Sequence, residues 1–96
     1  MRHELDLVFT EDKIKQIDKM LRGRRKAVFS VRVPGEDITI LLNVHSKQGK
    51  SSYCMQAELY HDGQRKYHTQ SFGADFETMW ELKFKGEQYL LYTSIE

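Results

Sequence analysis

The chain begins with a strand pattern and then changes to the period of a helix. Leu5, Leu7 and Phe9 recur at every second position, as in a strand with one buried face. From residue 11 the apolar residues recur instead at the spacing of one helical face. That face consists of Ile14, Ile17, Met20 and Leu21. The pattern therefore predicts an N-terminal strand followed by a helix from about Glu11 to Arg22.

Both ends of this helix carry recognisable signals. Thr10 is typical of an N-cap because its hydroxyl can accept a backbone N–H, and the acidic Glu11 and Asp12 follow in the first turn. Gly23 comes directly after Arg22, where helices commonly end in a residue with positive φ. We expect Gly23 to take that left-handed conformation.

The rest of the chain reads as three antiparallel hairpins. In the first, apolar residues alternate on both sides of Pro34-Gly35, which suits a two-residue turn with Val33 opposite Glu36. This register aligns opposite charges on one face and apolar residues on the other. The expected pairs are Val31–Ile38, Phe29–Ile40, Ala27–Leu42, Arg32–Asp37 and Val28–Leu41.

The second hairpin centres on Asp62-Gly63, a dipeptide that strongly favours a tight turn. With these two residues as the turn, one face carries the pairs Tyr60–Arg65 and Glu58–Tyr67. The other face carries Leu59–Lys66, Ala57–His68 and Tyr53–Phe72.

The third hairpin turns at Lys85-Gly86 and pairs Leu82 with Tyr89, Trp80 with Leu91, and Phe76 with Ile95. The predicted fold class is α+β, with the order strand, helix and then a six-strand antiparallel meander.

One helix is too narrow to cover such a sheet, because seven strands span roughly 30 Å and a helix about 10–12 Å. We therefore expect a strongly bent sheet or half-barrel packed on the helix. The second face of the sheet is also partly apolar, which predicts an outer patch for self-association or a partner. It carries Val28, Leu41, Cys54, Tyr60, Tyr67, Met79, Leu90 and Tyr92.

Composition fits a single domain spanning residues 1–96, with 40% hydrophobic residues to build a core. The one cysteine, Cys54, cannot form an internal disulfide and favours a reducing compartment. The N-terminus is charged where a signal peptide is apolar, and no apolar run approaches the roughly 18 residues of a membrane span. These features predict a cytoplasmic protein with no membrane segment.

The net charge of +1 conceals an uneven distribution. Residues 1–50 hold 11 Lys/Arg against 7 Asp/Glu, and residues 51–96 hold 4 against 7. The densest basic cluster consists of Arg22, Arg24, Arg25 and Lys26. Such a cluster can contact the phosphates of nucleic acid, or it can simply complement the dipole at the end of the helix. The pattern alone favours the second role.

In the second hairpin, Tyr60, Arg65 and Tyr67 are expected to share one face. This group can be ordinary cross-strand pairing, a protein-binding hot spot, or a platform on which single-stranded bases stack. We favour the structural role first and protein contact second.

No catalytic or metal-binding motif stands out. The histidines His3, His45, His61 and His68 lack metal-ligand spacing, and the register puts Cys54 and His68 on opposite faces. We expect no enzyme activity, no metal and no cofactor.

The sequence therefore favours a small cytosolic protein-binding module, of the inhibitor, immunity or accessory-factor type, that acts by occupying a partner surface. The alternative is a single-stranded nucleic-acid-binding domain that uses the sheet aromatics and the basic cluster. A third hypothesis, a half-barrel that holds a small ligand, would need a cavity near Trp80.

Overall fold

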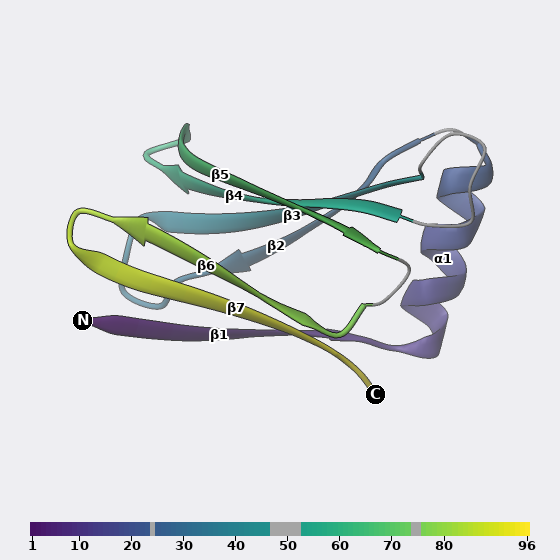
Figure 1. Ribbon diagram of the computed structural model, residues 1–96, viewed down its shortest axis with the longest axis horizontal. Coiled ribbons are helices and arrows are strands. Elements are labelled where there is room, and N and C mark those ends of the chain that lie inside the picture. Colours follow the sequence, from purple (N-terminus) through teal and green to yellow (C-terminus); the bar gives the residue numbers. More distant parts are fainter. Residues whose placement is uncertain (24, 47–52, 74–75) are drawn as a thin grey trace.

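The computed structural model describes residues 1–23, 25–46, 53–73 and 76–96, with the backbone alone at residues 46 and 67–73. Its elements follow the predicted order of one strand, one helix and further strands (Figure 1). They are β1 (Arg2–Phe9), α1 (Glu11–Arg22), β2 (Ala27–Arg32), β3 (Ile38–Ser46), β4 (Tyr53–His61), β5 (Gln64–Gly73), β6 (Thr78–Phe84) and β7 (Glu87–Ile95). The predicted α+β class is confirmed.

The strands form two sheets instead of one continuous sheet. A four-stranded antiparallel sheet has the order β2-β3-β4-β5, and a three-stranded sheet has the order β1-β7-β6. Consecutive strands therefore pair from β2 to β5 and again from β6 to β7. In the described ranges no backbone ladder joins β5 to β6. The N-terminal strand β1 instead pairs in parallel with β7, a partner that the sequence did not indicate.

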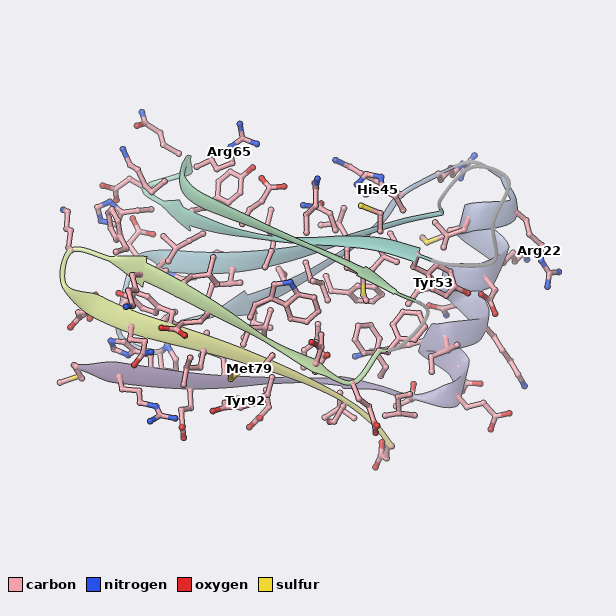
Figure 2. The ribbon with its side chains drawn as sticks, viewed as in Figure 1. Arg22, His45, Tyr53, Arg65, Met79 and Tyr92 are labelled. Carbon is pink, nitrogen blue, oxygen red and sulfur yellow. The ribbon has the colours of Figure 1, made fainter. Side chains whose placement is uncertain are left out.

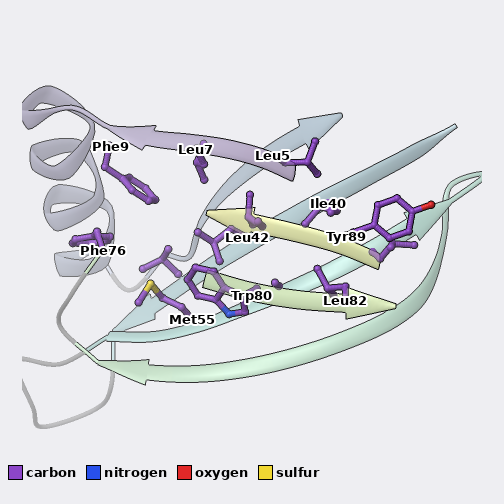
Figure 3. Close-up of a cluster of buried hydrophobic side chains, with 14 of the residues drawn as sticks. Leu5, Leu7, Phe9, Ile40, Leu42, Met55, Phe76, Trp80, Leu82 and Tyr89 are labelled. Carbon is purple, nitrogen blue, oxygen red and sulfur yellow. The ribbon is translucent and has the colours of Figure 1, made fainter. Parts of the chain in front are cut away.

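The inner faces of the two sheets enclose one hydrophobic core, and α1 packs across one end of it (Figures 1 and 3). Trp80, Leu82 and Tyr89 enter from the three-stranded sheet, and Ile40 and Leu42 enter from the four-stranded sheet. Every one of these side chains is at most 3% exposed. Two facing sheets thus bury the apolar surface that one helix could not cover.

The helix is positioned by its predicted cap and by two buried residues. The Thr10 hydroxyl accepts the Lys13 N–H at 3.3 Å, and Ile17 and Leu21 are buried in the core. Met20, expected on the buried face, is 44% exposed. No helix in the described part of the chain is long and apolar enough to cross a membrane.

The conformation predicted for Gly23 is wrong. Its φ is −79°, within the ordinary region, because its N–H still closes on the Lys19 carbonyl at 3.4 Å. The chain leaves the helix through a bond from the Arg25 N–H to the Met20 carbonyl at 3.0 Å. These two bonds satisfy terminal carbonyls of the helix while Gly23 itself keeps a negative φ.

The register predicted for the first hairpin is off by two residues. Val33 donates to the Ile38 carbonyl at 3.0 Å, so residues 34–37 form the loop. Within this loop Gly35 follows Pro34 with φ +76°, and the Glu36 N–H donates to the Val33 carbonyl, as in a type II turn. This turn bond is separate from the hydrogen bonds that pair β2 with β3. A shift of two residues keeps every side chain on its predicted face. The observed pairs are Ala27–Val44, Val28–Asn43, Phe29–Leu42, Ser30–Leu41, Val31–Ile40 and Arg32–Thr39.

The second hairpin follows the prediction only near its turn. Asp62 and Gly63 both have positive φ, and Tyr60 lies opposite Arg65. The register then shifts, because Leu59 pairs with Tyr67 and leaves Lys66 as an extra residue. Beyond this bulge every predicted pair is wrong by one position. The observed pairs include Glu58–His68, Ala57–Thr69 and Tyr53–Gly73.

The third hairpin is confirmed along most of its length. Leu82 pairs with Tyr89 and Trp80 with Leu91, as predicted. The pair Phe76–Ile95 is wrong, because Phe76 precedes β6 and Ile95 pairs with Phe9 of β1. Phe76 instead packs in the core at 4% exposure.

Candidate functional site

Two polar residues are nearly buried on the outward face of the four-stranded sheet. Asn43 on β3 and Glu58 on β4 are 3% and 8% exposed. Their neighbours along the strands, such as Leu42 and Leu59, point into the core, so Asn43 and Glu58 point outward by strand alternation. Buried polar groups on an outer sheet face need partners, which makes their contacts informative.

Those contacts converge on the Glu58 carboxylate. One oxygen accepts a hydrogen bond from the Asn43 amide, and the other accepts the Tyr60 hydroxyl at 2.9 Å. The Arg65 guanidinium lies 3.6 Å from that second oxygen. We call Asn43, Glu58, Tyr60 and Arg65 the Glu58 cluster. It joins three adjacent strands on one face.

The Glu58 cluster orients Tyr60 and Arg65, and tyrosine and arginine are enriched in protein-binding hot spots. The hydrogen bond to Glu58 raises the pKa of Tyr60 above its ordinary value, so its hydroxyl remains a donor. Arg65 is held at one end by the carboxylate while 58% of its side chain stays exposed. Because both side chains are already oriented, less rotamer freedom is lost when they meet a partner.

The surroundings of the Glu58 cluster are mixed in character. The register places Arg32 and Thr39 in the same cross-strand row as Tyr60 and Arg65. The face also carries Val28, which is 46% exposed. This face therefore combines the Glu58 carboxylate, two arginines on the edge strands β2 and β5, and the exposed side chain of Val28.

The predicted group of Tyr60, Arg65 and Tyr67 is only partly assembled. Tyr60 and Arg65 lie opposite each other, as expected. The bulge at Lys66 places the Tyr67 backbone opposite Leu59, and not opposite Glu58 as predicted. The Tyr67 side chain lies outside the described part of the structure.

The basic cluster lies at the other end of the molecule. Arg22, Arg25 and Lys26 are exposed around the C-terminal end of α1, and Arg24 falls outside the described residues. Figure 2 shows Arg22 beside α1 and Arg65 in the other half of the molecule, whose long axis measures 39 Å. The structure therefore does not bring the basic cluster and the Glu58 cluster into one surface.

A shallow hollow of about 400 Å³ adjoins this basic end and is lined by Gln16, Lys19, Met20, Gly23 and Arg25. Its cations lie at the negative end of the helix dipole, which is the structural role favoured from the sequence. Trp80 is 3% exposed and does not line this hollow.

The predicted outer patch is divided between two separate faces. Val28 lies on the four-stranded sheet, whereas Met79, at 49% exposure, and Tyr92 lie on the three-stranded sheet. In Figure 2 Arg65 and His45 lie on one side of the molecule, and Met79 and Tyr92 lie on the other. Leu90, expected in the patch, is 3% exposed. It occupies the central strand β7, where neighbouring strands flank it on both sides.

One further group of residues has the chemistry to hold a metal ion. Among the described residues, His3, Glu36 and Glu87 place a ligand atom each within 4.8 Å of the others. They come from three distant parts of the sequence, so no local spacing could have indicated them. The contact between Asn43 and Glu58 could not be found from local spacing either, because the two residues lie on different strands. A polar residue inside an apolar strand is nevertheless a signal that could have indicated each of them.

Comparisons with protein-family models, with curated proteins and with solved structures find no match to this chain. The functional argument therefore depends on the geometry of the chain itself.

Proposed function

We propose that this chain is a small cytoplasmic protein-binding module that acts by occupying a partner's surface with the outer face of its four-stranded sheet. Tyr60 and Arg65 are the central contact residues. The proposal assigns no reaction and no cofactor to this face. A module of this kind belongs to the functional class of inhibitors, immunity proteins and accessory factors.

The observation that carries this proposal is the nearly buried Glu58 carboxylate, which holds Tyr60 at 2.9 Å and Arg65 at 3.6 Å. Tyrosine and arginine are the residue types enriched in binding hot spots. A carboxylate with 10% side-chain exposure is a costly group to keep on an outer sheet face. Its use in orienting Tyr60 and Arg65 is the function that we assign to it.

The same observation disfavours nucleic acid as the ligand of this face. A phosphate that approached Arg65 would meet the negative charge of Glu58, 3.6 Å from the guanidinium. The basic cluster at the end of α1 does not adjoin Arg65 on this face. We therefore treat single-stranded nucleic acid as the alternative that the experiment must separate.

The experiment is quantitative affinity capture from a native lysate with three immobilised proteins. They are the unaltered chain, a Tyr60→Ala/Arg65→Ala variant, and a Tyr92→Ala/Arg2→Ala variant as matched control. The control removes the same two residue types from the other sheet, where Arg2 lies 3.5 Å from the Tyr92 hydroxyl. Circular dichroism first establishes that all three proteins are folded.

We expect a specific protein to be retained by the unaltered chain and by the control, and reduced at least tenfold by the Tyr60/Arg65 variant. Each hot-spot truncation typically costs 2 kcal/mol or more of binding free energy, which is the basis of this estimate. Nuclease treatment should leave capture unchanged. Equal loss in both variants, or loss of capture after nuclease treatment, would contradict the proposal.

A further inference from the structure

We propose that His3, Glu36 and Glu87 form a binding site for one divalent transition-metal ion of the zinc type. This inference is independent of the protein-binding role, because none of its three residues belongs to the Glu58 cluster. The three residues belong to β1, to the loop between β2 and β3, and to the first position of β7. In Figure 1 these segments meet at the end of the molecule away from α1.

The donor set has the right chemistry. One imidazole nitrogen and two carboxylates are common ligands of zinc, and their combined charge balances that of a divalent cation. Three protein ligands leave a fourth position for water, which is the arrangement of an open zinc site. Imidazole also favours zinc over magnesium, which prefers oxygen ligands alone.

The distances fit after a small movement of one side chain. Donors bound to one zinc ion in tetrahedral geometry lie about 3.4 Å apart. His3 Nε2 and Glu87 Oε2 are already 3.1 Å apart. The full group lies within 4.8 Å, and Glu36 is exposed on its loop, so its side chain can close the remaining gap.

Tyr89 orients both of the closer ligands. Its ring stacks on the His3 ring with a centroid distance of 4.7 Å and an interplanar angle of 8°. Its hydroxyl donates to Glu87 Oε2 at 2.9 Å. Tyr89 itself is 1% exposed, so it is a fixed support. Outer residues that orient metal ligands in this way are a regular feature of protein metal sites.

The backbone at all three positions is also fixed. β1 and β7 are paired through His3 and Tyr89, and the Gln88 N–H donates to the Met1 carbonyl at 3.0 Å. The Glu36 N–H donates to the Val33 carbonyl at 3.2 Å. A bound ion would therefore link the three-stranded sheet to the loop of the four-stranded sheet and stabilise their packing.

The test is calorimetric titration of the tag-free, chelator-treated protein with zinc chloride, together with thermal unfolding at each zinc concentration. We expect one saturable site per chain. At a zinc concentration about 100 times the Kd, Tm should rise by about 10–20 °C. Magnesium chloride at the same concentration should leave Tm unchanged.

Three variants assign the site. Glu36→Gln and His3→Gln each remove one ligand and should weaken zinc binding at least tenfold. Glu4→Gln makes the same carboxyl-to-amide change next to His3 but on the outer face of β1, and it should change the Kd less than twofold. Glu36 is exposed on a loop, so its variant tests the site even where His3→Gln fails to fold.

The proposal is overturned if zinc does not saturate one site, or if either folded ligand variant binds zinc as well as the unaltered chain. It is also overturned if a Cys54→Ser variant abolishes binding while Glu36→Gln retains it. That result would place the ion near His45 and Cys54, which are opposite each other on β3 and β4.

Discussion

A hydroxyl group forms a hydrogen bond between the helix and the four-stranded sheet. The Tyr53 hydroxyl at the start of β4 donates to the Asp18 carboxylate on α1. The Asp18 hydrogen bond, followed by burial and by the Asp18 charge, raises the pKa of Tyr53 from 10.0 to about 12. Figure 2 shows Tyr53 close to α1. The contact joins residues 35 positions apart in the sequence.

The Tyr53→Phe substitution removes this hydrogen bond and keeps the ring. We expect it to lower the free energy of unfolding at pH 7 by about 1 kcal/mol, the usual net value of one such bond, and Tm by about 4–8 °C. The folded pKa of Tyr53 is raised, so its stabilisation is fully present below pH 10. It is lost as the pH rises from 10 towards 12.

Urea unfolding of both proteins between pH 7 and pH 12 checks this expectation. The stability difference should shrink across the upper two pH units, because Tyr53 loses its proton there and the phenylalanine of the variant has none to lose. Tyr92→Phe is the control, since its hydroxyl makes exposed contacts with Glu4 at 3.4 Å and with Arg2 at 3.5 Å. A Tyr53→Phe difference that persists unchanged at pH 12 would show that the hydrogen bond is not its source.

At the scale of one element, α1 begins where the sequence predicts because Thr10 supplies its cap. The Thr10→Ala variant should lower the free energy of unfolding by about 1 kcal/mol, since it leaves the Lys13 N–H without its 3.3 Å acceptor. Thr10→Ser retains the hydroxyl and should recover most of the loss. Chemical unfolding measures both, and equal destabilisation by the two variants would contradict the capping role.

The elements that the sequence predicted well are those with local signals. Thr10, the turn at Asp62-Gly63 and the turn at Lys85-Gly86 are each determined by residues a few positions apart, and the structure has all three. The alternation of apolar residues also assigned most side chains to the correct face. That assignment is insensitive to a register error of two residues, such as the one at Pro34-Gly35.

The misplaced features are those that depend on a single inserted residue or on distant segments. Lys66 forms a bulge, and this one extra residue shifts the backbone partner of every later β5 residue by one position. The predicted pairs Glu58–Tyr67 and Ala57–His68 were wrong for this reason, since the Glu58 backbone pairs with His68. No local pattern distinguishes a bulged strand from a regular one.

At the scale of the whole molecule, the parallel pairing of β1 with β7 could not be read from the chain. It joins residues 2–9 to residues 88–95, and only the packing of two sheets determines it. The same long-range closure brings His3 to Glu87 and creates the proposed metal site. Functional residues assembled by such closure escape any search for spaced motifs.

The two sheets share one core, and this predicts that they unfold together. Leu42 on β3 and Trp80 on β6 belong to the same buried cluster, so neither sheet retains a complete hydrophobic face without the other. Trp80 is the one tryptophan in the chain and is 3% exposed, so its fluorescence reports on the three-stranded sheet. Far-ultraviolet circular dichroism reports on both sheets and the helix.

The Leu42→Ala variant tests quantitatively whether the two sheets unfold together. Loss of a fully buried leucine should cost about 2–5 kcal/mol, a large part of the 5–15 kcal/mol that is typical of such domains. Because the cavity lies in a shared core, the Trp80 fluorescence midpoint should fall as far as the circular dichroism midpoint, although Leu42 is on the other sheet. If the fluorescence transition stayed in place while circular dichroism shifted, the sheets would be separate folding units. The core that Figure 3 shows between them would then contribute little to their association.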